Sequence, residues 1–169
     1  MFTSDQLEEG CIYTRNELRQ KFNITDATLN TGIFQPSGSK SLWLFVTEQK
    51  PNDRMQYHDL LEGDRLYWEG QTEGRKDLVI IEHERNGLEL LVFYRKMKYE
   101  FPGAGFRCEG RFRYMSHTGS HPTRFVLQRI DAELSAAVKD IRAFQIEEWY
   151  QEGKLSATLV NIHERNPKL

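Results

Sequence analysis

The sequence predicts a single α+β domain that is mainly β: a twisted antiparallel sheet or pseudo-barrel with a short N-terminal helix and a C-terminal helix. The chain has 169 residues, which suffices for one substantial core but not comfortably for two. Six or so short apolar or alternating segments lie between turn residues and predict strands. Apolar residues at helical spacing occur mainly near the two ends.

Residues 1–31 are expected to form a helical extension packed on the β-rich part. Thr14-Arg-Asn-Glu17 is a capping-box pattern, and Leu18 and Phe22 follow at helical spacing, which predicts a helix over residues 14–22. A further turn is expected over residues 25–29. A small helix-turn-helix is the alternative, but its second helix would be shorter than two turns and has no basic face. The extension is therefore expected to close one end of the β domain.

Residues 32–133 are expected to form the β-rich core. Its strand signals lie at residues 33–34, 41–47, 65–69, 88–95, 106–114 and 123–130, with a short apolar segment at 57–61. The segment 41–47 is apolar on both faces, as in a central strand. The segment 77–87 is ambiguous, because its Val and Ile residues favour a strand while Asp77 and Gly87 stand at helix-end positions. A helix is favoured there.

Residues 134–163 predict a C-terminal helix over 134–152, ended by Gly153, and then a closing segment. Residues 164–169 are expected to form a linker. The chain has two cysteines, Cys11 and Cys108, no secretory leader and no long apolar run. We therefore expect a cytoplasmic protein without a membrane span. Neither a metal nor another cofactor is expected, because no zinc-ligand spacing is present.

Positive charge is concentrated in one part of the sequence. The chain has a formal charge of −2, but residues 95–130 contain eight basic and two acidic residues, which gives that segment +6 and the rest of the chain −8. A basic tract on an otherwise acidic protein suits a polyanion that meets one face only, such as a DNA backbone. A solvated strand face without such a partner is the alternative interpretation.

Arginines alternate with apolar residues in the segment 106–114. Period-2 alternation there puts the apolar side chains on one face and the arginines on the other. Guanidinium groups at this spacing can bind successive phosphates. The residues expected to contact the DNA backbone are Arg95, Arg107, Arg111, Arg113 and Arg124.

A glycine-containing loop after the strand at 65–69 predicts a second binding element. Gln and Arg side chains can bind base edges, an acid can accept from the amino group of cytosine, and aromatic rings can stack on an extruded base. The residues expected to line a base pocket or contact base edges are Tyr57, Trp68, Gln71, Arg75, Asp77 and Tyr94. The alternative is a polar loop in which Asp77 caps a helix.

Catalytic interpretations have weaker support. Glu48-Gln-Lys50 with Asp26 upstream matches part of a metal-dependent nuclease pattern, but such a short pattern arises often by chance. His117 and His121 are four residues apart, yet Gly119 between them disfavours a helix, so a solvated loop is expected. No nucleophile elbow, phosphate loop or dinucleotide fingerprint occurs. We therefore expect no catalytic centre in this chain.

Scattered stretches of the sequence resemble the N-terminal domain of bacterial HNH endonucleases of the modification-dependent restriction type. These stretches are Gly32-Ile-Phe34, Leu42-Trp-Leu-Phe-Val-Thr47, Tyr57-His-Asp-Leu60, Gly63-Asp64, Tyr67-Trp-Glu-Gly-Gln71, Gly74-Arg75, Phe93-Tyr-Arg95 and Gly110-Arg-Phe112. The chain is also similar, more distantly, to a domain at the C-terminus of some phage-defence helicases that carry a phospholipase-D-like nuclease. The tail 163–169 resembles the lead-in to an HNH nuclease domain, whose histidines, asparagine and zinc cysteines have no counterpart here.

The resemblance implies a specificity domain that binds double-stranded DNA, with methylated or hydroxymethylated cytosine as the expected target, while an absent nuclease domain cuts. It implies a barrel-like fold of the SRA, PUA-like or B3 kind, base flipping, and a homodimer formed through the parent nuclease. Two alternatives stay open. One is a protein-interaction module of a phage-defence complex, and the other is a small stand-alone metal-dependent nuclease that uses Glu48 and Lys50.

Overall fold

The computed structural model describes residues 1–49 and 59–130. Residues Met1–Arg129 form one compact unit. Tyr57, the predicted helix 134–152, the closing segment and the linker 164–169 lie outside the described residues. No helix within the described ranges is long and apolar enough to span a membrane.

The N-terminal extension contains short helical elements and one short strand. They are η1 (Thr3–Gln6), β1 (Ile12–Tyr13), α1 (Arg15–Phe22) and η2 (Ala27–Asn30). The N-cap half of the predicted capping box is confirmed, since the Thr14 hydroxyl accepts a hydrogen bond from the Glu17 backbone N–H at 3.1 Å. The helix ends at Asn23, which adopts the left-handed conformation.

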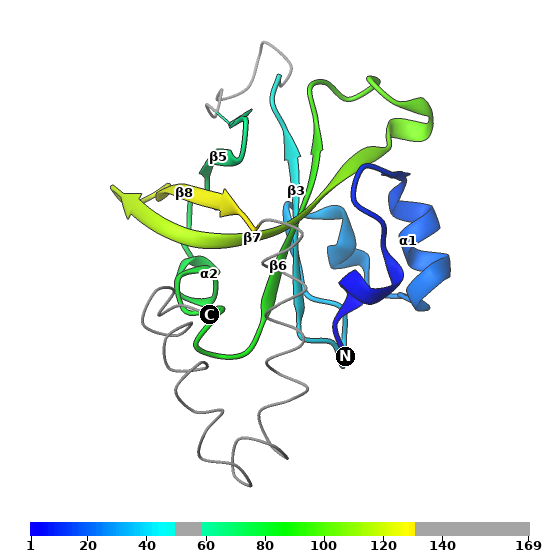
Figure 1. Cartoon of the computed structure of the whole chain (residues 1–169), viewed down its shortest axis with the longest axis horizontal. Helices are drawn as coiled ribbons and strands as arrows, with labels where there is room; N and C mark the ends of the chain where they lie inside the picture. The colour runs from blue at the N-terminus through cyan, green and yellow to red at the C-terminus, as the bar shows by residue number, and fades with distance from the viewer. Residues whose placement is uncertain (50–58, 131–169) are drawn as a thin grey trace, which may run out of the picture. The chain divides into compact units, whose positions relative to one another are not determined.

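The described residues contain an eight-stranded mixed sheet, which confirms an α+β fold that is mainly β (Figure 1). Beyond β1, its strands are β2 (Ile33–Phe34), β3 (Ser41–Thr47), β4 (Leu60–Glu62), β5 (Arg65–Glu69), β6 (Glu89–Arg95), β7 (Phe106–Thr118) and β8 (Arg124–Arg129). They follow the order β2-β3-β6-β7-β8-β5-β4, and β1 pairs with β7. The sheet is open, and β3 and β6 are parallel while the other pairs are antiparallel, so it differs from the predicted antiparallel sheet or pseudo-barrel in both respects.

The parallel pair exists because the chain leaves β3, forms the β4–β5 hairpin and crosses back through α2 (Asp77–Ile81) before it enters β6. The predicted helix 77–87 is thus confirmed over its first half only. The rest is a turn that ends at Gly87, whose φ of 72° favours glycine. A last short helical turn, η3 (Pro102–Ala104), precedes β7.

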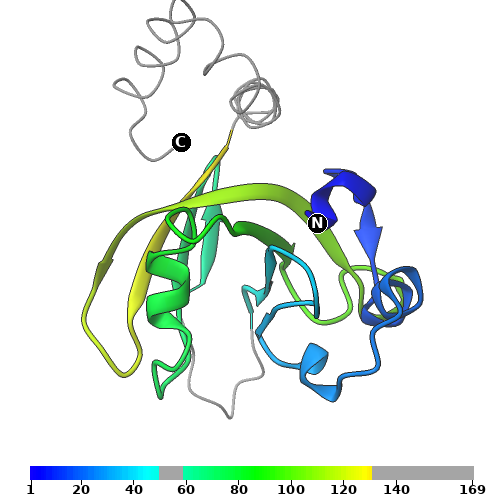
Figure 2. The ribbon, with the colours of Figure 1, turned by 90° about the horizontal axis from the view of Figure 1, so that it is seen from below.

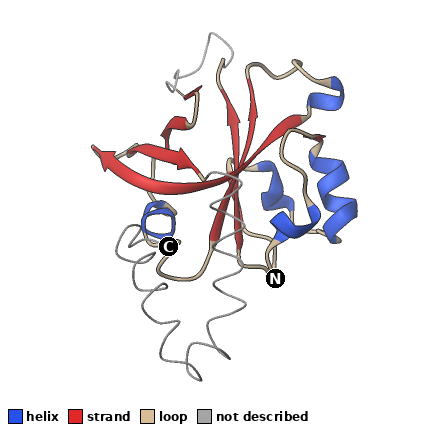
Figure 3. Ribbon diagram, in the orientation of Figure 1, coloured by secondary structure: helices blue, strands red, loops and turns tan. Residues whose placement is uncertain are grey.

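Each face of the central strands has its own core. The α2 face buries alternate aliphatic residues of β3 and β6 under α2, with Ile80 fully buried. The α1 face buries an aromatic cluster under α1 and η2, centred on Trp43. Figure 3 shows the two helices on either side of the central strands. This two-sided burial explains why the segment 41–47 is apolar throughout.

A β-bulge in β7 changes which side chains share a face. Val92 pairs with Gly110 and Phe93 pairs with Cys108, so Glu109 is the extra residue. Cys108 therefore packs in the α1-face core, whereas Phe112 packs in the α2-face core. Gly110 has φ of 85°, and a Cβ there would lie 2.9 Å from a Glu9 carboxylate oxygen. The prediction that all apolar residues of 106–114 share one face is wrong, because alternation counted along the sequence does not detect an inserted residue.

A buried carboxylate joins the N-terminal extension to the sheet. Glu89 accepts hydrogen bonds from the Ser4 backbone N–H at 3.0 Å, the Ser4 hydroxyl at 2.6 Å and the Ser41 hydroxyl at 2.7 Å. The Arg111 guanidinium lies 3.4 Å from the same carboxylate. Four groups from the extension, β3 and β7 thus converge on one charge, which stabilises it in a buried position.

We predict that Glu89→Gln lowers the free energy of unfolding by about 3–5 kcal/mol, because Arg111 is left as a buried charge without its counterion. Urea denaturation measures the change. Glu82→Gln is the control, because Glu82 pairs with Arg85 at the surface and should contribute about 1 kcal/mol or less. Equal losses in the two variants would contradict the role given to Glu89.

Candidate functional site

The second half of β7 runs beside β8 and β5 and forms a curved wing of the sheet (Figure 2). On the α2 face the wing buries Leu66, Trp68, Phe125 and Leu127 in the core. The opposite face of β4, β5, β8 and the second half of β7, which we call the outer face, carries polar and half-exposed residues. This face is the candidate functional site.

Strand register arranges the outer face in three rows of side chains. Tyr114 pairs with Leu127 and Ser116 pairs with Val126, so Met115 is the extra residue of a second bulge in β7. Without this bulge, Met115 would be the partner of Val126. The rows that cross the strands are Thr118–Arg124–Glu69, then Ser116–Val126–Tyr67–Leu60, then Arg113–Gln128–Arg65–Glu62. An apolar and aromatic row therefore lies between two charged ones.

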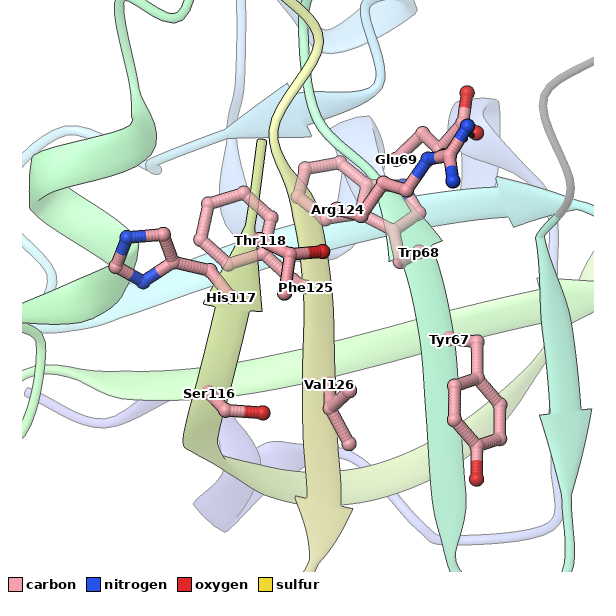
Figure 4. A pocket seen from close by; sticks show the side chains of 9 residues that line it. All are labelled: Tyr67, Trp68, Glu69, Ser116, His117, Thr118, Arg124, Phe125 and Val126. Carbon is pink, nitrogen blue, oxygen red and sulfur yellow. Dashed lines mark ion pairs between the residues drawn. The ribbon is translucent and has the colours of Figure 1, made fainter. Parts of the chain in front are cut away.

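The middle row borders a shallow hollow of about 230 Å³. Figure 4 shows Ser116, Val126 and Tyr67 side by side on neighbouring strands. The side chains that line the hollow are Tyr67, Trp68, Glu69, Ser116, His117, Thr118, Arg124, Phe125 and Val126. Tyr67 is 38% exposed and Leu60 is 40% exposed, so a ring face and an aliphatic group are accessible for contact.

Two of the three arginines in the charged rows, Arg65 and Arg124, contact a side chain on a neighbouring strand. The Arg124 Nε lies 3.4 Å from a Glu69 oxygen, and the Arg124 side chain is 71% exposed, so the ion pair orients the guanidinium while its outer nitrogens face solvent. The Arg65 Nε donates to the Gln128 amide oxygen at 3.3 Å. The Arg113 Nε is buried and has no hydrogen-bond partner among the described residues. Three guanidiniums from β5, β7 and β8 thus surround the middle row.

Both histidines are exposed, but only His121 lies in the predicted loop, because His117 is a residue of β7 that pairs with Phe125. The His117 Nδ1 is 2.6 Å from the Tyr114 hydroxyl, and the His121 Nδ1 is 3.0 Å from the Thr72 carbonyl oxygen. The second contact joins the loop after β7 to the loop after β5. No cluster of three or more His, Cys, Asp or Glu side chains suited to a metal occurs within residues 1–49 and 59–130.

The predicted arginine surface does not form as expected. Arg95 is 8% exposed, and its guanidinium donates to the Thr47 hydroxyl and to the Lys98 and Ala104 carbonyl oxygens. Arg111, also 8% exposed, is paired with Glu89 on the α1 face. Arg107 is exposed but pairs in register with Tyr94, so the bulge puts it on the opposite face from Arg111.

Arg129 is also neutralised inside the fold. Its guanidinium lies 3.0 Å from carboxylate oxygens of Glu9, Asp64 and Glu109. Burial lowers the pKa of Arg129, but Glu109 and Glu9 together raise it above its ordinary value. Much of the basic tract therefore binds carboxylates or backbone within the protein. Of the five predicted backbone contacts, only Arg113 and Arg124 lie together on the outer face.

The predicted base pocket is likewise not assembled. Trp68 is a core residue stacked on Phe125 at 5.5 Å. Tyr94 is buried and donates its hydroxyl to Glu48 at 2.8 Å, and burial followed by this carboxylate raises its pKa. The sequence alone does not distinguish an aromatic residue that packs in a core from one that stacks on a base. In the structure both Trp68 and Tyr94 face the core on the α2 side of the sheet.

The loop after β5 is organised by Asp77. Its carboxylate accepts from the Thr123 hydroxyl at 2.5 Å and lies 3.0 Å from the Cβ positions that Gly70 and Gly74 leave empty. Asp77 thus holds this loop to the residue before β8, but it does not cap a helix as the alternative predicted, because Lys76 is the N-cap of α2 and Asp77 is the first helical residue. Arg75 is exposed and Gln71 half-exposed on the same loop, away from Tyr94 in the core.

The partial nuclease pattern finds no common site in the described residues. Asp26 caps η2 by accepting from the Thr28 backbone N–H at 2.9 Å, and Glu48 is engaged by Tyr94. Lys50 lies outside the described residues. Sequence reasoning instead missed Arg65, Tyr67 and Gln128, although alternation in 65–69 marks the first two as sharing a face.

Comparison with known proteins finds similarity among solved structures only. No protein-family model and no curated protein matches the sequence. Among solved structures, the chain is similar to a modification-dependent TagI restriction endonuclease, with 20% identity and a TM-score of 0.45. The match covers 76% of this chain and 52% of the endonuclease chain, so this chain spans about half of that protein's length.

We predict that Trp68→Ala destabilises the protein by about 3–5 kcal/mol, because it removes a buried ring that packs on Phe125. Tyr67→Ala should change stability by only about 1 kcal/mol or less, because the ring is at the surface. Denaturant unfolding of both variants measures the difference. A stable Trp68→Ala protein would show that Trp68 does not belong to the core.

Proposed function

We propose that this chain binds double-stranded DNA on its outer face. The observation that carries the proposal is the placement of Arg65, Arg113 and Arg124 on three adjacent strands around an exposed row containing Tyr67. Guanidiniums bind phosphate oxygens bidentately, and such contacts supply most of the affinity for DNA. The neighbouring hydroxyls and amide offer groups for base edges.

The spacing of the three arginines suits a duplex. Arg113 and Arg65 flank Gln128 on either side of β8, so their backbones lie about 10 Å apart, as two strand separations require. Arg124 is four residues from Gln128 along β8, about 13 Å away. These separations are comparable to the width of the DNA major groove, about 12 Å, so the arginines can contact phosphates on both sides of that groove.

We propose, more specifically, that the domain selects DNA containing modified cytosine for an HNH restriction endonuclease, whose nuclease domain cuts the DNA. The support for this proposal is the sequence resemblance described above. On the outer face, Ser116, Thr118 and Gln128 can donate to and accept from base edges, while Tyr67 and Val126 offer apolar contact to a methyl group. This chain would then choose the DNA site without cleaving it.

A binding titration tests the proposal. The full chain is titrated with methylated, hydroxymethylated and plain duplexes of one sequence at two salt concentrations. Arg124→Gln and Arg65→Gln should each weaken binding to all three duplexes and reduce the salt slope by about 1, because each removes one phosphate contact. Tighter binding to a modified duplex supports the finer proposal.

Arg85→Gln is the matched control, since Arg85 is 82% exposed like Arg124 but lies beyond α2, away from the outer face. Its binding should equal that of the unaltered protein. If no duplex binds more tightly than about 10⁻⁴ M, the weak end of non-specific binding, DNA binding is rejected. If Arg85→Gln weakens binding as much as Arg124→Gln, the location on the outer face is rejected.

Half-exposed apolar side chains favour one second candidate, a protein-interaction module. Leu60, Tyr67 and Met115 are each exposed by about two fifths at or beside the outer face, which is a composition found at protein interfaces. Absence of DNA binding, together with a defined complex with a protein partner that is lost on Tyr67→Ala, would favour this candidate.

A further inference from the structure

Two arginines converge on one aromatic ring at the ends of β3 and β6, remote in sequence from the outer-face arginines. Arg15 is the first residue of α1 and Arg95 is the last residue of β6. The Arg95 guanidinium lies 4.0 Å from the Phe106 ring centroid, and the Arg15 guanidinium lies 5.0 Å from it. Arg15 also lies 4.6 Å from the Phe45 ring centroid. The rings hold both cations against the α1-face core.

Neither guanidinium has a carboxylate partner among the described residues. The Arg15 Nε donates to the Leu29 carbonyl oxygen at 3.2 Å, and Arg95 donates to one hydroxyl and two carbonyl oxygens. All of these acceptors are neutral. Two carboxylates in adjoining segments are engaged elsewhere, Glu48 by the Tyr94 hydroxyl and Glu100 by the Lys96 backbone N–H.

This arrangement leaves positive charge uncompensated in a partly buried place. Burial lowers the pKa of Arg15 to about 10, and the neighbouring charges of Arg95 and Arg19 add to the effect. Arg111 and Arg129, by contrast, each have a carboxylate partner. Like charges near one another are costly without a counterion, so an anion bound between them would be stabilised strongly.

We propose that Arg15 and Arg95 form a binding site for a phosphate-type oxyanion. The Arg15 Nη1 and Nη2 and the Arg95 Nη2 make no hydrogen bond to a described residue, so each arginine retains donors for an anion. Arg19, whose Nη2 donates to Asn30, adds positive charge on the next turn of α1. The anion is a free phosphate or a phosphate group of a polynucleotide, which share the same tetrahedral oxygen acceptors.

Thermal unfolding with and without inorganic phosphate tests the site without relying on DNA binding. The full chain is heated in phosphate and in chloride buffers of equal ionic strength, so that general screening cancels. At about ten times the dissociation constant, phosphate should raise the melting temperature by roughly 3–6 °C. Arg15→Gln should lose this rise, and the exposed control Arg85→Gln should keep it.

Arg15→Lys provides a second variant that retains the charge and the aliphatic stem if the Gln variant folds poorly. It should bind phosphate about tenfold more weakly, because an ammonium group lacks the bidentate fork. Equal stabilisation by phosphate and chloride in the unaltered protein would overturn the proposal. So would a phosphate effect of full size in both Arg15 variants.

A DNA titration of Arg15→Gln distinguishes the two sources of the anion once the phosphate effect is established. Weaker DNA binding with a lower salt slope would identify the anion as a backbone phosphate. Unchanged DNA binding would identify a free phosphate-type ligand. Loss of DNA binding in Arg124→Gln with an intact phosphate effect would show that the anion site and the outer face are separate.

Discussion

The inserted residue Glu109 in β7 determines which side chains of the central strand face which core. Before it, Phe106 and Cys108 complete the aromatic cluster under α1, and after it, Phe112 completes the aliphatic core under α2. Gly110 permits the change of direction with its positive φ, and the Glu9 carboxylate closes over it. Because β1, β6 and β8 all pair with β7, the inserted residue lies in the strand that joins both halves of the sheet.

Residues of β7 also take part in the ion pairs that neutralise arginines within the fold. The carboxylates of Glu89 and Glu109 hold Arg111 and Arg129 within the fold, so arginines that look like a basic surface in the sequence instead join the N-terminal extension and the β4–β5 turn to the sheet. Arg65, Arg113 and Arg124 remain on the outer face, where strand register spaces them. A modest formal charge thus coexists with a local set of guanidiniums that can meet a polyanion.

Local signals in the sequence predicted the fold class and most elements. The capping box at Thr14, the two-sided apolar segment 41–47 and the alternating segment 106–114 each correspond to an observed element. Single-residue insertions were not predictable, because bulges at Glu109 and Met115 depend on pairing with distant strands. One parallel strand pair and an open sheet also depend on long-range packing.

The candidate site was predicted only in part for the same reason. Arg113 and Arg124 were identified, but Trp68 and Tyr94 belong to the core, since the residues that face solvent on β5 are Arg65, Tyr67 and Glu69. Arg15 stood out in no pattern, because its significance comes from Phe106 and Arg95, which are remote in sequence. The residue types indicated which binding groups the protein has, but the register of the strands determines which of these groups lie together on one face.

Amide chemical-shift mapping during titration of the full chain with a duplex tests the central claim most directly. The account predicts that the largest shifts fall on β5, β8 and the second half of β7, around Tyr67, Ser116 and Val126, while α2 and the turn that ends at Gly87 stay unchanged. Shifts concentrated at α2 and that turn, with unchanged signals along β5 and β8, would contradict it.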